Sequence, residues 1–204
     1  MNTDFYNIAD LLTTEQQLIA STVRNFSDRE IKPIIEDYAQ RAEFPLHLIK
    51  MFGELGVFGP TIPLEYGGGG LDYISYGLMC QEIERGDSGM RSTISVQSSL
   101  VMWPIHEFGS EEQKQKYLSG LAGGELVGCF GLTEPDHGSN PAGMKTRISK
   151  TENGYLLNGS KMWISNAPFA DIAVVWARDE EGKVRGLIVE RGMAGFTTPE
   201  IHNR

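Results

Sequence analysis

The sequence predicts an α+β protein in which a helical domain precedes an antiparallel β domain of barrel-like form. Apolar residues recur at helical spacing through the first part of the chain, between capping and helix-breaking residues. After Gly123 and Gly124, short runs rich in β-branched and aromatic residues alternate with Asn-Gly turn signals. Helices followed by strands favour separate α and β domains. We therefore predict a helical domain at residues 1–123 and a β domain at residues 124–204.

The first predicted helix is long. Thr14 and Gln17 have the spacing of a capping box, and an apolar face follows them at helical spacing. Because proline removes a backbone donor, we expect a bend near Pro33. Pro45 suits the first turn of a short second helix, which is expected to end at Gly56.

Three further helices are expected before the β domain. The glycine run at residues 67–70 predicts a loop, after which helical spacing resumes over residues 74–85. Residues 92–106 are nearly uncharged, which predicts a helix buried on most sides. Ser110 and Gln113 form another capping box, which opens the last helix.

The β domain is expected to hold about five or six strands, as its turn spacing indicates. One strand is expected through Phe130 and Leu132, and the others at residues 155–158, 161–165, 171–178 and 184–190. A small barrel usually needs more strands to close and to cover its edges. We therefore expect this domain to be incomplete.

Composition limits the classes of function. The chain carries 27 acidic and 18 basic residues, a formal net charge of -9, which argues against a general nucleic-acid or anionic-membrane surface. No secretory signal is evident, and no apolar run reaches the ~20 residues of a membrane span. We expect a cytoplasmic protein, or a mitochondrial matrix protein if a presequence has been removed.

Several familiar sites are not predicted. The glycines at 67–70 lack the Lys-Ser or Lys-Thr of a phosphate loop and indicate a flexible turn, and no GxSxG serine nucleophile is present. Cys80 and Cys129 lack metal-ligand spacing and are expected to be buried thiols of a reducing compartment. The histidines show no paired spacing, so no metal site is expected; they are His47, His106, His137 and His202.

The segment at residues 129–139, CFGLTEPDHGS, can carry chemistry. Its proline and glycines end a strand and turn the chain. The hydroxyls of Thr133 and Ser139, with nearby backbone groups, can then face a flat heterocycle. On its own this signal is weak, because Thr and Ser near a turn are more often local caps.

A second segment, KMWISN at residues 161–166, can also contact a flat ring. In a strand, Trp163 and Ser165 would lie on the same face, so that the indole can cover a ring and the hydroxyl can donate to a ring nitrogen. Taken alone, a Trp in a sheet is most often core packing.

Together, in this order and spacing, the two segments resemble the acyl-CoA dehydrogenase family. EYGGGGLD, FGSEEQKQKYLSGLAGGEL and NGSKMWISN extend the resemblance over essentially the whole chain. It implies an N-terminal α domain, a middle β domain and a C-terminal four-helix domain, with FAD between the last two and commonly a homotetramer. The implied catalytic base is a Glu of the C-terminal domain, which we expect to be absent from this chain. We therefore expect no catalytic base in this chain, and no activity from it alone.

The resemblance also implies the residues that contact the flavin. Ile164 and Ser165 would reach its N5 side, and Ser139 would also border the acyl-CoA. This sequence has Ser165 where many relatives have Thr, and Asn140 where Asp is usual. The full implied set is Phe130, Gly131, Leu132, Thr133, Gly138, Ser139, Trp163, Ile164 and Ser165.

Arg91 gives information on the identity of the substrate. A cation in an otherwise apolar helix needs an anion, and composition leaves open a structural pair with Glu84 or Asp87 or a ligand carboxylate. ERGDSGMRSTISVQSSLVM is similar to glutaryl-CoA dehydrogenases, which implies that Arg91 and Ser92 bind the γ-carboxylate and that Glu84 influences proton movement.

The implied activity is FAD-dependent α,β-dehydrogenation of glutaryl-CoA to glutaconyl-CoA, with loss of CO2 to crotonyl-CoA as a further step. An electron-transfer flavoprotein or a similar acceptor would be the partner, and the pathway would be lysine and tryptophan degradation. Two alternatives stay open: a dehydrogenase for another short-chain acyl-CoA, with Arg91 purely structural, and a non-catalytic module that keeps the family fold.

Overall fold

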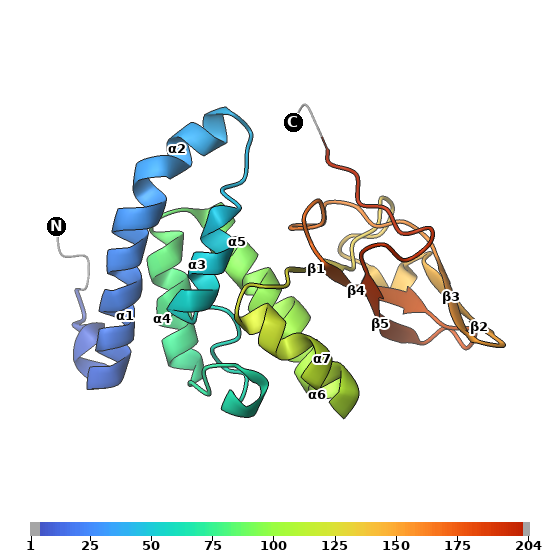
Figure 1. Ribbon diagram of the computed structural model, residues 1–204, viewed down its shortest axis with the longest axis horizontal. Coiled ribbons are helices and arrows are strands. Elements are labelled where there is room, and N and C mark those ends of the chain that lie inside the picture. Colours follow the sequence, from blue (N-terminus) through green and yellow to red (C-terminus); the bar gives the residue numbers. More distant parts are fainter. Residues whose placement is uncertain (1–4, 202–204) are drawn as a thin grey trace.

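The computed structural model describes residues 5–201 and has a helical domain followed by a β domain, as predicted (Figure 1). The helices pack beside one another, and the sheet lies to one side of the helices that precede it in the chain. His202 lies outside the described residues. The α-helices are α1 (Thr14–Phe26), α2 (Lys32–Gln40), α3 (His47–Leu55), α4 (Tyr73–Glu84), α5 (Ser88–Ser95), α6 (Trp103–Phe108) and α7 (Glu111–Ala122).

The long first helix and the long buried helix both contain a π-helical segment. Ser27–Ile31 joins α1 to α2, and Val96–Met102 joins α5 to α6. Each segment ends two residues before a proline, Pro33 or Pro104. Because proline lacks the N–H that a regular helix requires, an irregular turn at this place relieves the mismatch.

The capping box of α1 lies one residue earlier than predicted. Thr13, not Thr14, is the N-cap: its hydroxyl accepts from the Gln16 N–H, and the Gln16 side chain accepts from the Thr13 N–H at 3.0 Å. Gln16 also donates to Asp72 at 3.0 Å. Asp72 caps α4, so a contact between helices selects the register that local sequence left ambiguous.

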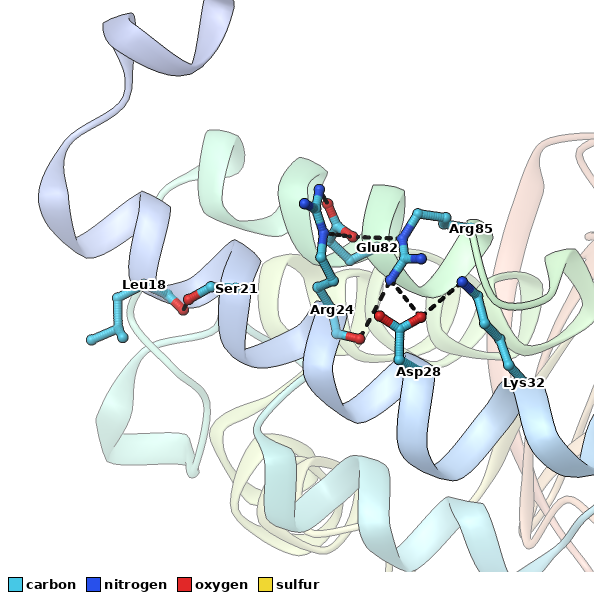
Figure 2. A network of polar contacts seen from close by, with 7 residues as sticks. All are labelled: Leu18, Ser21, Arg24, Asp28, Lys32, Glu82 and Arg85. Carbon is cyan, nitrogen blue, oxygen red and sulfur yellow. Dashed lines mark hydrogen bonds and ion pairs between the residues drawn. The ribbon is translucent and has the colours of Figure 1, made fainter. Parts of the chain in front are cut away.

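A buried carboxylate joins α1 to α4 (Figure 2). Glu82 is 1% exposed and accepts hydrogen bonds from Arg24 at 2.7 and 2.9 Å and from Arg85 at 3.0 Å. Arg85 also pairs with Asp28 at 3.0 Å. Burial by itself raises the pKa of Glu82, but the hydrogen bonds from the two guanidinium groups hold that pKa below its ordinary value. The network fixes the C-terminal end of α4.

The sheet has five strands arranged around β4: β1 (Gly128–Gly131), β2 (Arg147–Thr151), β3 (Gly154–Asn158), β4 (Ile172–Arg178) and β5 (Val184–Glu190). β5 pairs antiparallel along one edge of β4. β1 and β2 pair parallel with β4 on its other edge, and β3 forms an antiparallel hairpin with β2. The sheet is therefore mixed and not purely antiparallel. Parallel pairing requires a long connection, and long stretches of chain separate β4 from both β1 and β2.

The side-chain amide of Gln97 links the two domains. Gln97 is fully buried in the π segment between α5 and α6. Its oxygen accepts from the Gly128 N–H at 2.8 Å, and its nitrogen donates to the carbonyls of Leu121 and Leu126 at 2.9 and 2.8 Å. Gly128 must lack a side chain, because a Cβ there would lie 2.4 Å from Val101. The first residue of β1 thus packs directly against the helical domain.

One apolar cluster runs through both domains. It includes Ile94 and Val101 from the helices and Val174 from β4. Cys129 is buried in it, and burial raises the pKa of its thiol to about 11, while Cys80 is half-buried. Within residues 5–201, none of the helices combines the length and the apolar character needed to cross a membrane.

Replacing Gln97 by Leu tests the link between the domains. The Gln97→Leu variant leaves the Gly128 N–H and the Leu126 carbonyl without partners, at a cost of about 1–3 kcal/mol each, whereas the Leu121 carbonyl still accepts from the Gly124 N–H. We expect the free energy of unfolding, measured by urea denaturation, to fall by about 2 kcal/mol or more. Gln115→Leu, at an exposed site of α7, should change it by only about 0.5 kcal/mol. A loss below about 1 kcal/mol in Gln97→Leu would contradict this role.

The Glu82 network should make stability depend on pH. Because the folded pKa of Glu82 lies below its ordinary value of 4.5, its contribution is fully present above the unfolded pKa and is lost as the pH falls through the folded pKa. We expect Glu82→Gln to cost about 1–3 kcal/mol at pH 7 and to flatten the acid side of a plot of unfolding free energy against pH. Glu43→Gln, in an exposed pair with Arg41, should leave the curve unchanged; equal acid curves for wild type and Glu82→Gln would exclude the assignment.

Candidate functional site

The two segments singled out from the sequence meet beyond the end of β1. The Met162 N–H donates to the Thr133 carbonyl at 2.9 Å, and the Lys161 ammonium donates to the Leu132 carbonyl at 3.0 Å. Thr133 and Trp163 therefore belong to adjoining stretches of chain, as predicted. They form one edge of the β domain.

The prediction of a strand at residues 161–165 is wrong. These residues form an irregular turn, in which Trp163 has φ 61° and Asn166 has φ 67°, both left-handed. A left-handed backbone is unusual for a residue as bulky as Trp, so the surrounding contacts must hold it. The argument that Trp163 and Ser165 share one face of a strand therefore fails, although both side chains are exposed.

Asn166 and Arg191 hold this turn in place. The buried Asn166 amide donates to the Gly128 carbonyl at 3.2 Å. Arg191 donates to the carbonyls of Ala167 at 2.9 Å and Ala170 at 2.5 Å. Neither residue was assigned a role from the sequence, although Asn166 ends the segment at residues 161–166 and Arg191 follows the last predicted strand. These bonds fix the backbone of the turn that carries Ser165 relative to β1.

Thr133 presents two donors that the described chain does not use. Its carbonyl accepts from Met162, but within residues 5–201 neither its N–H nor its hydroxyl has an acceptor, and the residue is half-buried. Leu132 beside it is also half-buried, and Phe130 packs edge-on against Trp176 with ring centroids 6.0 Å apart. An apolar surface with free donors at its end suits the polar edge of a flat ring.

A cavity of about 240 Å³ lies beside Ser165, between the start of α5 and the 165–169 turn. Phe44 and Phe169 stack at 4.8 Å in its wall. Ser92, which was predicted to act with Arg91, lines this cavity with Ser165. The complete lining is Phe44, Gly89, Met90, Ser92, Thr93, Ser165, Asn166 and Phe169.

Arg91 lies in a row of polar groups between α4 and α5. Its Nε donates to Glu84 at 2.6 Å and its Nη1 to the Ser95 hydroxyl at 3.0 Å. Of the two carboxylates considered from the sequence, Glu84 is the partner, because Asp87 caps α5 by accepting from the Met90 N–H. The hydrogen bond to Glu84 raises the pKa of Arg91. Ser95 was missed, although its place one helical turn after Arg91 was the signal.

A second buried carboxylate lies beneath the Thr133 segment and was also missed. Glu134 is 5% exposed, and its oxygens accept from the Lys161 ammonium and the Thr146 N–H at 2.9 Å, and from the Lys145 N–H at 2.5 Å. Burial opposes its ionisation, but these hydrogen bonds and that of the Thr146 hydroxyl lower its pKa to about 2.

The other predicted site residues occupy less defined surroundings. Gly138 and Ser139 are exposed in the loop before Pro141–Gly143, so their contacts with a ligand remain predictions. Gly131 is buried at the end of β1, and Ile164 is half-buried. No group of three His, Cys, Asp or Glu side chains in the described part of the chain could hold a metal ion.

Comparisons with known proteins agree with this geometry. Residues 13–125 match the acyl-CoA dehydrogenase N-terminal domain, and residues 129–204 match the acyl-CoA dehydrogenase middle domain. A probable acyl-CoA dehydrogenase of Bacillus subtilis, YngJ, is 41% identical over 200 residues, which are 95% of this chain and 52% of that protein. The chain thus spans about half the length of such relatives.

Many solved structures are similar, among them a glutaryl-CoA dehydrogenase and a butyryl-CoA dehydrogenase. A glutaryl-CoA dehydrogenase from Mycobacterium smegmatis, in complex with FADH2, has a TM-score of 0.95 and 48% identity over 98% of this chain and 51% of its own. Butyryl-CoA dehydrogenase from Megasphaera elsdenii has a TM-score of 0.85 and 36% identity over 91% of this chain and 51% of its own. The predicted fold and the predicted cofactor, FAD, are confirmed, and this chain belongs to the acyl-CoA dehydrogenase family.

Proposed function

We propose that this chain carries the flavin edge and the carboxylate-binding residues of an FAD-dependent glutaryl-CoA dehydrogenase. The observation that carries the proposal is the placement of Arg91, a partly exposed guanidinium between two helices of the α domain. A monocarboxylic acyl chain has no group that needs such a cation. A dicarboxylic chain has one at its far end.

Arg91 has donors left for a ligand. Its side chain is 35% exposed, and Glu84 and Ser95 are its acceptors in the described chain, through Nε and Nη1. The Nη2 group is therefore open to another oxygen, and guanidinium binds carboxylates well through two parallel hydrogen bonds. Glu84 is itself 47% exposed, so it can share Arg91 with the acid end of a substrate and remain near the acyl chain.

The residues beyond β1 fit a flavin. FAD, when bound, supplies the acceptor for the hydride that leaves the β carbon of an acyl thioester. Thr133 would donate its N–H and hydroxyl to the polar edge of the ring, Trp163 would cover one side, and Ser165 would donate near N5. The base that removes the α proton is not assigned to a residue of this chain. An electron-transfer flavoprotein or a similar protein is the expected acceptor, and the complete enzyme is expected to be a homo-oligomer.

A dehydrogenase for another short-chain acyl-CoA is the second candidate. Glu84 already neutralises Arg91 at 2.6 Å, so the ion pair can be purely structural. The similarity to butyryl-CoA dehydrogenase supports this alternative.

Rates of flavin reduction by two substrates separate the candidates. In the full-length protein loaded with FAD, we expect glutaryl-CoA to bleach the flavin absorbance faster than butyryl-CoA. Arg91→Met removes a charge-assisted interaction, so it should slow reduction by glutaryl-CoA about 10- to 100-fold and leave butyryl-CoA almost unaffected. Stopped-flow absorbance near 450 nm measures both rates.

Arg29→Met is the matched control, because Arg29 is 76% exposed and pairs only with Glu30 in the described chain. It should change neither rate. Equal losses with both substrates in Arg91→Met would favour the structural role, and product analysis for glutaconyl-CoA or crotonyl-CoA shows whether decarboxylation follows.

A further inference from the structure

We propose that the buried pair Lys161–Glu134 positions the flavin-binding edge, by clamping the backbone on both sides of Thr133. The inference rests on the proposed function, since it assigns these two residues a task in binding FAD. They are positioning residues, because they act on the ligand through Thr133 and Trp163 and are not placed to touch it.

One ammonium group spans Thr133. Lys161 donates to the Leu132 carbonyl at 3.0 Å and to the Glu134 carboxylate at 2.9 Å, and these are the residues immediately before and after Thr133. The next residue, Met162, donates its N–H to the Thr133 carbonyl at 2.9 Å. Leu132, Thr133 and Glu134 are thus all held by Lys161 and Met162. The N–H and hydroxyl of Thr133 have no protein acceptor in the described chain.

The carboxylate end of the pair is anchored to a different part of the β domain. Glu134 accepts from the backbone N–H groups of Lys145 and Thr146 and from the Thr146 hydroxyl, just before β2 begins. The side chains of Lys161 and Glu134 are only 10% and 4% exposed. Because an unpaired charge in such a place is costly, loss of either partner should displace the other.

The same pair sets the start of the strained turn. Lys161 comes two residues before Trp163, whose left-handed backbone must be held by its surroundings. The far end of the turn is fixed independently, by Asn166 on the Gly128 carbonyl. Both walls of the proposed flavin slot, Thr133 and Trp163, therefore depend on the position of Lys161.

Stability alone does not account for this pair. A buried ion pair contributes little net stability compared with apolar residues of the same size. A methionine at residue 161 would fill nearly the same space but leave the buried Glu134 carboxylate without its cation, so it should lower folding stability as well. A purely structural pair would not change the affinity for flavin in protein that is still folded, so flavin binding by the folded variant is the measurement that separates the two roles.

FAD titration of Lys161→Met and Glu134→Gln tests the proposal. We expect at least about tenfold weaker binding in Lys161→Met, with a changed shape of the flavin absorption band near 450 nm, and a smaller change of the same kind in Glu134→Gln. The full-length apoproteins are compared at a temperature at which thermal unfolding curves show each to be folded. If Lys161→Met does not fold, Glu134→Gln carries the test.

Lys183→Met is the matched control, because Lys183 pairs with Glu181 on the surface of the β domain, with side chains 63% and 70% exposed, and has no contact with Glu134 in the described chain. It should bind FAD with wild-type affinity and spectrum. Wild-type binding and spectra in both test variants would overturn the positioning role and leave the proposed function intact. Failure of the wild-type protein itself to bind FAD would overturn both.

Discussion

The buried amide of Gln97 is the contact on which the arrangement of this protein depends. It binds the N–H of Gly128, the first residue of β1, while the amide of Asn166 binds the carbonyl of the same glycine. One peptide segment is thereby held from the helical side and from the turn that carries Ser165. The Thr133 segment continues from β1. The two hydrogen bonds to Gly128 therefore also determine where the Thr133 segment lies.

Buried polar groups fix each part of the site in turn. Lys161 and Glu134 hold the Thr133 segment, and the Glu82 network fixes the end of α4 that carries Glu84. Every one of these groups has charged or backbone partners, as buried charges require. The side chains proposed to meet ligands are, in contrast, half-buried or exposed. Buried hydrogen bonds that hold accessible donors in fixed positions allow a ligand to bind with little rearrangement of the protein.

The order of the domains and most of the elements could be predicted from local patterns. The capped helix after Ser110 and the strand within residues 171–178 have strong local signals, and the structure confirms both. The strand predicted at residues 161–165 is absent because tertiary hydrogen bonds override β propensity there. Arg91 was identified from its apolar surroundings, but Ser92 and Ser95 look alike in the sequence. Their roles differ only because the helix turns one toward the cavity and the other toward Arg91.

A crystal structure of the full-length protein with FAD and glutaryl-CoA tests the account most directly. We expect the flavin ring between Thr133 and Trp163, with the Thr133 N–H and hydroxyl donating to its polar edge, and the γ-carboxylate of the substrate on Arg91. A flavin bound elsewhere on the β domain would contradict the account. So would a γ-carboxylate that lies far from Arg91 while Arg91 pairs with Glu84 alone.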